Sequence, residues 1–239
     1  MFSTNIGREF SEVVTNAVIL KIINEDEQDK TCNYNGSTVQ QDFFKQMPSK
    51  NFLVPQGLAF NIINKSMKHK SYLSTNNITF GLGIVTGNND LYIKDKSEDG
   101  FEPVISGKEL GKYFVKYNKI NKYILFEKNK LQQVAPESLY RCKNKILYKF
   151  IGKKLTFSIE NRGLLNLNSA NMICFPDHAN IYYILAVLNS RLTQLLFDEY
   201  YDTHKVLKSH IQSFPIYEIK MKIKEQNILK KLKHYSTYL

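Results

Sequence analysis

The stretch "KILYKFIGKKLTFSIE", residues 145–160, decides which fold this chain adopts. Its side chains alternate, so that Ile146 and Tyr148 point to one side of a strand while Leu147 points to the other. Gly152 lies midway, where a tight turn with a positive φ would reverse the chain. The stretch is therefore predicted to form a β-hairpin.

A strand and a helix are expected after the hairpin. The short apolar run "NMICF", residues 171–175, is typical of a strand. Residues 179–201, "ANIYYILAVLNSRLTQLLFDEYY", carry the strongest helical pattern in the chain. The pattern predicts one long helix with a buried apolar stripe, which consists of Ile181, Ile184, Leu185, Leu188, Leu192, Leu195 and Leu196.

Another helix is predicted before the hairpin, beginning at "SGKEL", residues 106–110. Ser106 and Glu109 have the spacing of a capping box, which satisfies free N–H groups at a helix start. Four apolar side chains then follow at helical intervals and are expected to face the core; they are Leu110, Tyr113, Phe114 and Tyr117. The lysines on another face of this helix are either solvated or turned toward DNA; they are Lys108, Lys112 and Lys116.

The first hundred residues contain weaker signals. The β-branched run at 12–23 predicts a buried strand, and the acidic, polar residues 24–37 that follow it predict an exposed loop. Apolar residues at near-helical spacing predict a helix over 55–70. The tail, at 220–235, is a basic helix candidate. Together these elements predict an α+β fold, mixed and mostly antiparallel, β-rich, with several packed helices and a long helix in the C-terminal half.

Length and composition fit one large domain, or one domain with a fragment of another. The chain has 239 residues, of which 43% are hydrophobic, and its apolar runs are too short to cross a bilayer. Cys32, Cys142 and Cys174 are widely separated and lack metal-site spacing. A reducing cytoplasm is the expected location.

The net charge of +11 is unevenly distributed. Residues 1–100 hold 10 Lys/Arg and 11 Asp/Glu, whereas residues 101–239 hold 23 and 11. This excess points to a polyanionic partner for the second half of the chain. An alternative is that the lysines accompany the many Asn, Ile and Tyr residues that AT-rich genes encode.

The glycine-rich stretch "FGLGIVTGNNDLYI", residues 80–93, could be mistaken for a phosphate-binding loop. Such a loop must lead into a helix whose N-terminus receives the phosphate. Here the following residues are expected to form a turn and then a strand, so Gly81, Gly83 and Gly87 are interpreted as turn and close-packing positions. Asn88 and Asn89 in that turn could contact a ligand.

No convincing catalytic site is found in the sequence. The five histidines lack metal-ligand spacing, and no nucleophile has a supporting motif. Asp177, Glu218 and Lys220 loosely imitate the carboxylate and lysine pattern of metal-dependent nucleases. A nuclease fragment therefore stays open as an alternative, as does a protein-assembly domain that contacts DNA little. The chain alone is not expected to be catalytic.

Five blocks in order resemble one family: "GIVTGNNDLYI", "PVISGKEL" with "YFV", "KILYKFIGKKLTFSIENRGLLNLNSANMICF", "YYILAVLNSRLTQLLFDEYY" and "LKSHIQSFPI". Together they are similar to the TaqI-like C-terminal specificity domain, over about residues 73–219. In that family this domain is the target-recognition part of adenine-specific DNA methyltransferases and type II restriction-modification enzymes, and it is related to type I specificity subunits.

The resemblance implies a DNA-recognition module that binds duplex DNA and positions it for a separate catalytic domain that flips and methylates adenine. Residues 1–48 resemble the end of such a catalytic domain with a linker, and residues 49–239 the recognition domain. The family's adenine-binding and cofactor motifs do not occur in this sequence. S-adenosylmethionine is therefore implied only for that catalytic domain, on the same full-length chain or on a partner subunit, and no cofactor, metal or membrane partner is expected here.

Phosphate contacts are predicted from the basic hairpin and its flanks, because lysine and arginine supply most of the affinity for DNA. The first-rank candidates are Arg141, Lys143, Lys145, Lys149, Lys153, Lys154 and Arg162. The second-rank candidates after the long helix are Lys205 and Lys208. Asn88 and Asn89 are candidates for contacts to base edges.

Overall fold

The structure is a computed structural model, and it describes residues 2–7, 17–23, 30–34, 36–46, 57–66, 71–73, 78–176, 180–201 and 203–217. The strands are β1 (Phe2–Gly7), β2 (Ala17–Lys21), β3 (Thr31–Tyr34), β4 (Ser37–Gln40), β5 (Ser71–Tyr72), β6 (Thr79–Gly81), β7 (Ile93–Lys94), β8 (Phe101–Ile105), β9 (Tyr113–Phe114), β10 (Tyr123–Leu125), β11 (Lys145–Lys149), β12 (Phe157–Glu160), β13 (Leu165–Asn166), β14 (Ala170–Cys174) and β15 (Pro215–Ile216). The helices are α1 (Gln41–Gln46), α2 (Gly57–Ser66), α3 (Asn89–Tyr92), α4 (Glu137–Arg141), α5 (Ile181–Leu188), α6 (Arg191–Tyr200), α7 (Lys208–Gln212) and the short 3-10 turn η3 (Tyr117–Lys119).

A five-stranded sheet in the order β6-β14-β11-β12-β9 forms the centre of the fold. The predicted hairpin is confirmed, since β11 and β12 pair antiparallel from Lys145 opposite Glu160 to Tyr148 opposite Phe157. The tight turn predicted at Gly152 is wrong: residues 150–156 form a longer connection, and Gly152 is not among the described glycines with positive φ. This connection bends aside because the Gly152 N–H donates to the carbonyl of His204 at 2.8 Å.

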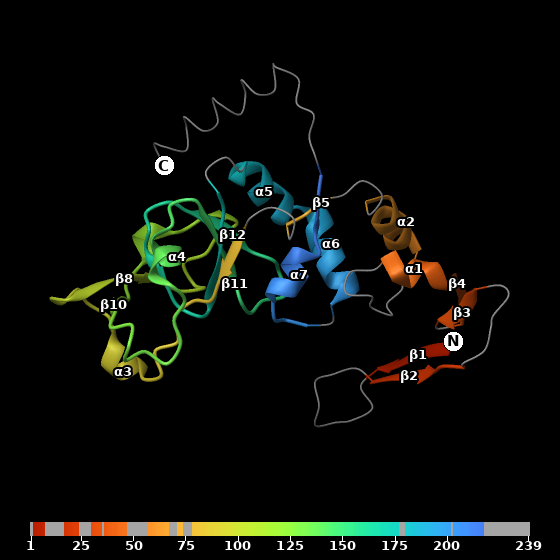
Figure 1. The fold of residues 1–239 in the computed structure, drawn as a ribbon, viewed down its shortest axis with the longest axis horizontal. Helices are drawn as coiled ribbons and strands as arrows, with labels where there is room; N and C mark the ends of the chain where they lie inside the picture. Colours follow the sequence, from red (N-terminus) through yellow and green to blue (C-terminus); the bar gives the residue numbers. More distant parts are fainter. Residues whose placement is uncertain are drawn as a thin grey trace, which may run out of the picture.

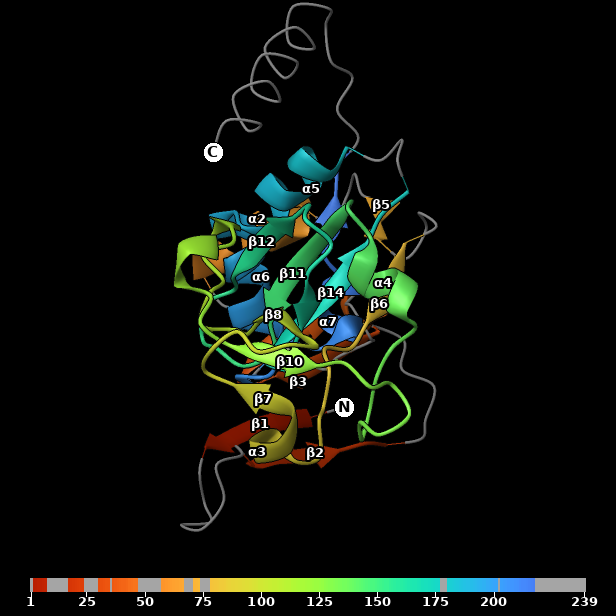
Figure 2. The ribbon, with the colours of Figure 1, turned by 90° about the vertical axis from the view of Figure 1, so that its left-hand side faces the viewer.

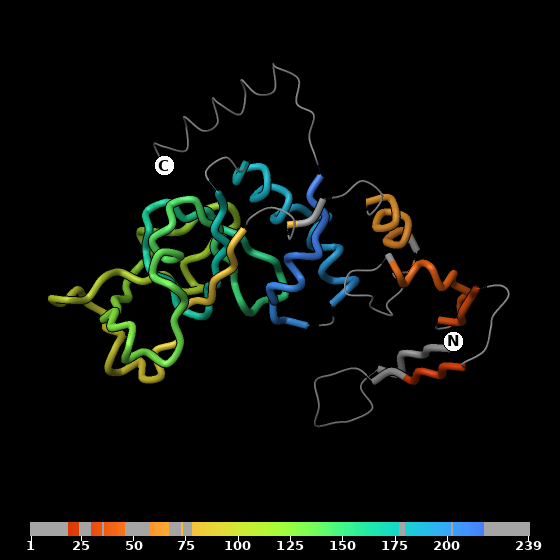
Figure 3. Tube along the Cα trace, viewed as in Figure 1, coloured from red at the N-terminus to blue at the C-terminus, as the bar shows by residue number. Residues whose placement is uncertain are grey.

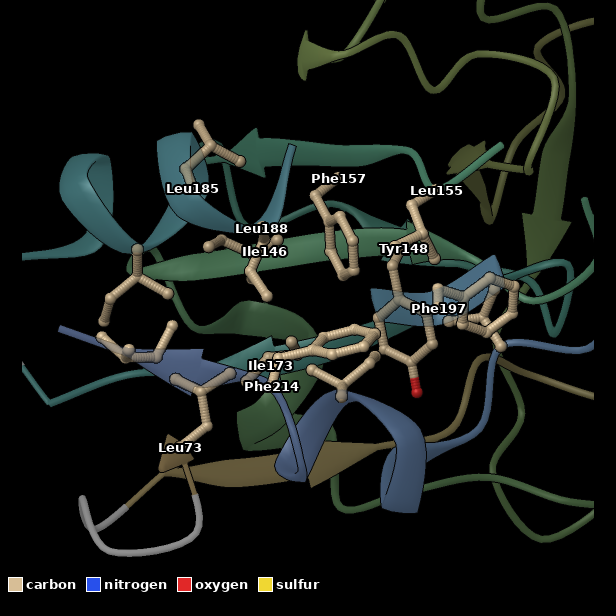
Figure 4. Packing of buried hydrophobic residues seen from close by; sticks show 14 of the residues in the cluster. Leu73, Ile146, Tyr148, Leu155, Phe157, Ile173, Leu185, Leu188, Phe197 and Phe214 are labelled. Carbon is tan, nitrogen blue, oxygen red and sulfur yellow. The ribbon is translucent and has the colours of Figure 1, made fainter. Parts of the chain in front are cut away.

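One face of this sheet is covered by helices. Ile146, Tyr148 and Phe157 project into a buried cluster with side chains of α5, α6 and the segment after α7 (Figure 4). The predicted alternation along β11 is thus confirmed, because these side chains share one face while Leu147 belongs to the cluster on the opposite face. At about 25 cal/mol per Å² of buried apolar surface, such a cluster is the main stabilising term of a domain.

A second, four-stranded sheet packs near the other face. Its order is β13-β8-β10-β7, and its buried residues share a cluster with Leu147, Met172 and the ring of Tyr140 from α4. Figures 1 and 2 show the resulting layers, with the β8–β10 part and α4 on one side of β11 and β12 and with α5, α6 and α7 on the other. The trace in Figure 3 shows that the segment 78–176 forms one side of the molecule before the chain continues into α5–α7. The α+β fold with mostly antiparallel strands is confirmed.

The N-terminal elements form a separate four-stranded sheet in the order β2-β1-β3-β4. The strand predicted within 12–23 is confirmed as β2, but Ile19, Leu20, Ile22 and Ile23 are exposed instead of buried. The loop expected over 24–37 instead contains β3 and the start of β4, because an antiparallel pairing of Thr31 with Gln40 closes this segment into a hairpin. The predicted helix over 55–70 is present as α2.

Two helix predictions need correction. No helix forms over 106–117; Glu109 does accept from the N–H and hydroxyl of Ser106 at 2.7 Å, but these bonds close a local turn. Leu110 and Val115 then pair across the following residues as a β-bridge. The long helix predicted over 179–201 is divided into α5 and α6 at Asn189 and Ser190. The basic helix candidate at 220–235 lies outside the described residues.

Candidate nucleic-acid interface

The two ends of the central hairpin present different side chains. Lys149 on β11 pairs with Ala170 of β14, whereas Lys145 at the start of β11 pairs with Cys174. Since β12 runs antiparallel to β11, the connection 150–156 lies at the end that contains Lys149. The residues around Glu160 lie at the opposite end. The predicted phosphate contacts are thereby divided into two separate groups.

Four connections gather at the Lys149 end, and we call this the loop end: residues 82–88, 150–156, 167–169 and 203–206. The Phe150 N–H donates to the Ser169 carbonyl at 3.1 Å, which joins the second connection to the third. The Val206 N–H donates to the Phe150 carbonyl at 2.8 Å, which adds the fourth. The Asn168 N–H donates to the Ile84 carbonyl at 3.0 Å, which adds the first.

The cations at the loop end are available to an external anion. Lys153, Lys154 and Lys205 are exposed, and Lys149 is partly exposed. No ion pair with another described residue engages any of them. A β-bridge between Ile151 and Lys205 places the second-rank candidate Lys205 next to the hairpin connection. The loop end therefore gathers a positively charged group that was spread over more than fifty residues of sequence.

A pocket with a polar rim opens at the same end. Its volume is about 290 Å³, and its lining residues are Ile84, Val85, Thr86, Gly87, Asn89, Gln132, Leu167 and Asn168. Amide side chains are the groups that pair bidentately with adenine edges in DNA. The pocket therefore presents amide side chains at the same end of the central sheet as the exposed lysines.

Asn88 and Asn89 are turn residues whose side-chain oxygens are already engaged. The Oδ1 atom of Asn88 accepts from the Leu91 N–H at 3.3 Å and caps α3, while Oδ1 of Asn89 accepts from the Thr86 hydroxyl at 2.6 Å. The turn-then-strand expectation for this stretch is corrected in one respect, because the single helical turn α3 precedes β7. Both asparagines are exposed, so their Nδ2 groups can donate to a ligand.

The glycines of the same stretch occupy close-packing and turn positions, as the sequence predicted. A Cβ at Gly83 would lie 2.1 Å from the Leu167 carbonyl oxygen, so only glycine permits this approach of the two connections. The Gly83 N–H also donates to Oδ1 of Asn171 at 2.9 Å. Gly87 has a φ of 79°, which glycine adopts without strain.

Lys145 has a structural role and no access to phosphate. Its side chain is fully buried, and Nζ lies 3.0 Å from Oε2 of Glu160, which is also fully buried. The ammonium also donates to the carbonyls of Tyr140 and, at 2.8 Å, Leu164. Burial lowers the pKa of Lys145, while the Glu160 carboxylate acts in the opposite direction. This lysine ties β11 to β12 and to the turn that follows.

Arg141 is held by acidic neighbours in the same way. Its Nη1 and Nη2 atoms donate to the two carboxylate oxygens of Glu102, each at 2.7 Å. Nε donates to Glu137 at 3.2 Å. These hydrogen bonds raise the pKa of Arg141, and the hydrogen bond to Glu102 has the largest effect. The guanidinium joins α4 to β8, and two carboxylates already compensate its charge.

The other predicted cations lie away from the loop end. Lys143 is exposed just before β11. Arg162 is exposed at the opposite end, where its guanidinium carbon lies 3.8 Å from the centre of the Tyr117 ring. Lys208 on α7 lies over the ring of Phe80, with Nζ 5.5 Å from its centre. The structure thus does not combine these three residues with Lys153 and Lys154.

Sequence reasoning missed Gln132 and Asn168, which complete the pocket. Gln132 belongs to a segment without a clear pattern, and it reaches the pocket because the backbone of Gln133 pairs with Val85. Asn168 follows β13 in the asparagine-rich "NLNSAN". The concentration of amides in that turn was the one signal that could have found it.

The structure gives no geometric support to the nuclease alternative. Asp177, Glu218 and Lys220 lie outside the described residues, and the described residues contain no group of three His, Cys, Asp or Glu side chains that could hold a metal ion. Within the described part of the chain, no helix has the length and apolar character needed to cross a membrane.

We compared the chain with known proteins to find the family that it resembles. No curated protein matches the chain. One similar solved structure concerns complex assembly and conformational transition of the type I R-M system; its chain is 12% identical, with a TM-score of 0.44. The similarity covers 70% of this chain and 37% of that one, so this chain spans little more than a third of its length. The family model of the TaqI-like C-terminal specificity domain matches residues 102–216. The chain is therefore similar to the TaqI-like C-terminal specificity domain over residues 102–216, as the sequence blocks predicted.

Proposed function

We propose that this chain recognises a short sequence in duplex DNA within a restriction-modification system. The observation that carries the proposal is the match of residues 102–216 to the TaqI-like specificity domain. The loop end, which lies mostly within the matched residues, supports it, because it brings cations and amide side chains to the same end of the central sheet. Recognition of a sequence in duplex DNA needs both kinds of group, because cations bind the phosphates and amides hydrogen-bond to the base edges.

Affinity is assigned to the lysines of the loop end. Residues 102–216 contain 17 Lys/Arg and nine Asp/Glu. Arg141 and Lys145 are compensated internally, so Lys149, Lys153, Lys154 and Lys205 supply the charge that is free at the loop end. Each phosphate contact releases condensed counterions, so binding should weaken steeply as salt concentration rises.

Specificity is assigned to the pocket. Asn89, Gln132 and Asn168 lie on its wall, and asparagine and glutamine amides are suited to pairing with an adenine edge in the major groove. Asn88 lies between the lining residues Gly87 and Asn89 and is also exposed, so we assign its amide to the same surface. In this assignment the asparagine and glutamine side chains read the bases, while the lysines fix the register of the duplex.

The catalytic step is assigned to another domain. We infer that the recognised DNA is positioned for an adenine methyltransferase domain, which binds S-adenosylmethionine and lies on the same full-length chain or on a partner subunit. Residues 1–48 are proposed as the end of that domain, and residues 49–239 as the recognition domain. The exposed apolar side chains on β2 and just after it support this division, because they offer a surface for further sheet or helix packing; they are Ile19, Leu20, Ile22 and Ile23.

Selection from a pool of randomised duplexes tests the proposal. The full chain should enrich one short sequence, and Asn89→Ala or Gln132→Ala should relax the preference at one position and weaken binding to the enriched sequence by about 1–3 kcal/mol. The matched control is Asn161→Ala, since Asn161 is exposed at the opposite end. Absence of any enriched sequence at low salt would refute the assignment.

A further inference from the structure

An exposed turn at the edge of the central sheet carries two consecutive aromatic side chains. Tyr113 is 47% exposed and Phe114 is 57% exposed. Among the residues whose side chains the structure describes, no other aromatic residue is exposed to this degree. The 30 Tyr and Phe residues of the chain are otherwise buried or partly buried wherever they are described. Two adjacent exposed rings are therefore a departure from the rest of the molecule.

The turn is built firmly, so the exposure is not the result of a loose loop. The buried side chains of Leu110 and Val115 anchor its two ends and form a β-bridge. The Gly111 N–H donates to the Phe114 carbonyl at 3.1 Å across the turn. The Ser158 hydroxyl donates to the Gly111 carbonyl at 2.5 Å, which ties the turn to β12.

Tyr113 adopts a backbone conformation that bulky residues avoid. Its φ is 79°, in the left-handed region that favours glycine. Such a conformation costs of order 1–3 kcal/mol and persists where the surroundings impose it, commonly at functional sites. Tyr113 nevertheless remains 47% exposed in this conformation, so about half of its surface is open to a ligand.

The sequence on either side of the two rings is basic. Between Glu102 and Glu127 the only acidic residue is Glu109, which is buried, whereas the same stretch contains five lysines. A Cβ placed on Gly111 would lie 3.4 Å from Cε of Lys116 and 3.6 Å from Cε2 of Phe114. The stem of this lysine and the Phe114 ring therefore lie side by side over the glycine. A ring beside an ammonium matches the two parts of a nucleotide, its base and its phosphate.

We propose that Tyr113 and Phe114 form a stacking platform for a nucleobase displaced from the DNA duplex, with Lys116 beside it for the phosphate. The inference rests on the proposed DNA recognition and adds a second contact area to it. A wedge that enters a base step must project freely, whereas Tyr113 and Phe114 each have about half of their surface against the protein and half open, as a platform has. Strand addition by a protein partner is disfavoured, because β9 is only two residues long and lysines flank it.

Two duplexes and one double variant test the proposal. One duplex carries a single unpaired 2-aminopurine, and the other is fully paired. The chain contains no Trp, so the fluorescence of this adenine analogue is read without a tryptophan background. Wild-type protein should quench the unpaired 2-aminopurine on binding. The double variant Tyr113→Gly with Phe114→Ala should not quench it and should bind that duplex about ten-fold more weakly, within the range for removal of one base stack.

The controls separate this inference from the function on which it rests. The double variant should bind the fully paired duplex within about two-fold of wild type, and Tyr113→Gly relieves the positive φ, so its melting temperature should not fall. Phe114→Tyr should retain quenching, and Leu58→Ala, which removes an exposed apolar side chain on α2, should change nothing. Equal quenching by the double variant, or equal weakening of affinity for both duplexes, would overturn the platform. Failure of wild-type protein to bind either duplex would instead overturn DNA recognition itself.

Discussion

Single residues in this chain show why a lysine in a basic sequence is not automatically a ligand for DNA. Lys145 and Lys149 lie on the same strand, four residues apart. The first is fully buried against Glu160, and the second reaches the surface of the loop end. Glu160 also accepts from the N–H groups of Arg162, Gly163 and Leu164. The buried pair therefore organises a turn rather than a binding surface.

Replacing Lys145 by Met should lower the free energy of unfolding by about 3 kcal/mol, because removal of one partner leaves a buried carboxylate without its compensating charge. Lys149→Met on the same strand is the matched control and should change it by less than about 1 kcal/mol. Urea denaturation measures both. Equal values for the two variants would contradict the structural role of Lys145.

His210 is expected to make the fold sensitive to mild acid. Its Nδ1 atom accepts from the Leu207 N–H at 3.3 Å, and its ring stacks on Tyr201 with 3.9 Å between centres. Burial lowers the pKa of His210 below its ordinary value of 6.5. The unfolded chain therefore binds the proton more readily than the folded chain does, and stability should fall as pH decreases below about 6.5.

The measurement is the free energy of unfolding at several pH values for wild type and His210→Asn. The Oδ1 atom of asparagine can accept from the same N–H but does not titrate in this range. The decrease in stability below pH 6.5 should be smaller in the variant, and an unchanged pH profile would exclude His210 as its cause.

At the scale of elements, helical periodicity alone misled in two places. The spacing of Tyr113 and Phe114 predicted a buried helix face, yet both lie exposed on β9. Gly107 and Gly111 lower the helix propensity of that segment, and Leu110 is buried by pairing across a turn instead. The stripe over 179–201 predicted the right buried residues in α5 but not the break before α6.

Asn189 produces that break. Its side chain accepts from the Phe157 N–H at 3.2 Å, donates to the Phe157 carbonyl at 2.9 Å and donates to the Leu185 carbonyl at 3.1 Å. Ser190 then caps α6 through its hydroxyl, which accepts from the Thr193 N–H. The end of α5 is thereby attached to β12, the neighbour of the central strand β11.

Substituting Asn189 by Ala should cost about 3 kcal/mol of unfolding free energy, because two buried backbone groups of Phe157 would be left without their partner. Asn161→Ala, at an exposed asparagine, should cost less than about 1 kcal/mol. Thermal or urea unfolding of both variants gives the comparison. A small effect at Asn189 would mean that the helix break is set by Ser190 instead.

At the scale of the whole molecule, the sequence predicted the central hairpin, the neighbouring strand β14, helix α2 and the α+β class. It did so because apolar alternation and helical stripes are local patterns that burial enforces. The loop end could not be predicted, because its four connections meet only through pairings between distant residues, such as Gly152 with His204. Lys205 and Gln132 acquire their place only from that topology.

The family match, the loop-end lysines and the amide pocket together lead to one claim, that the loop end of the specificity domain binds the DNA backbone. If the account is correct, DNA affinity depends on the cations at one defined place and not on the net positive charge of the protein as a whole. Two sets of three cations permit the comparison: Lys153, Lys154 and Lys205 at the loop end, and Lys119, Lys143 and Arg162 elsewhere, all exposed.

The most direct test is the dependence of duplex DNA affinity on salt concentration for two triple alanine variants with the same net charge. Alanine at Lys153, Lys154 and Lys205 should reduce the slope of log affinity against log salt by about 0.9 for each phosphate that the variant no longer neutralises. Alanine at Lys119, Lys143 and Arg162 should leave the slope close to that of wild type. Equal slopes in the two variants, or a larger reduction in the second, would contradict the assignment of DNA binding to the loop end.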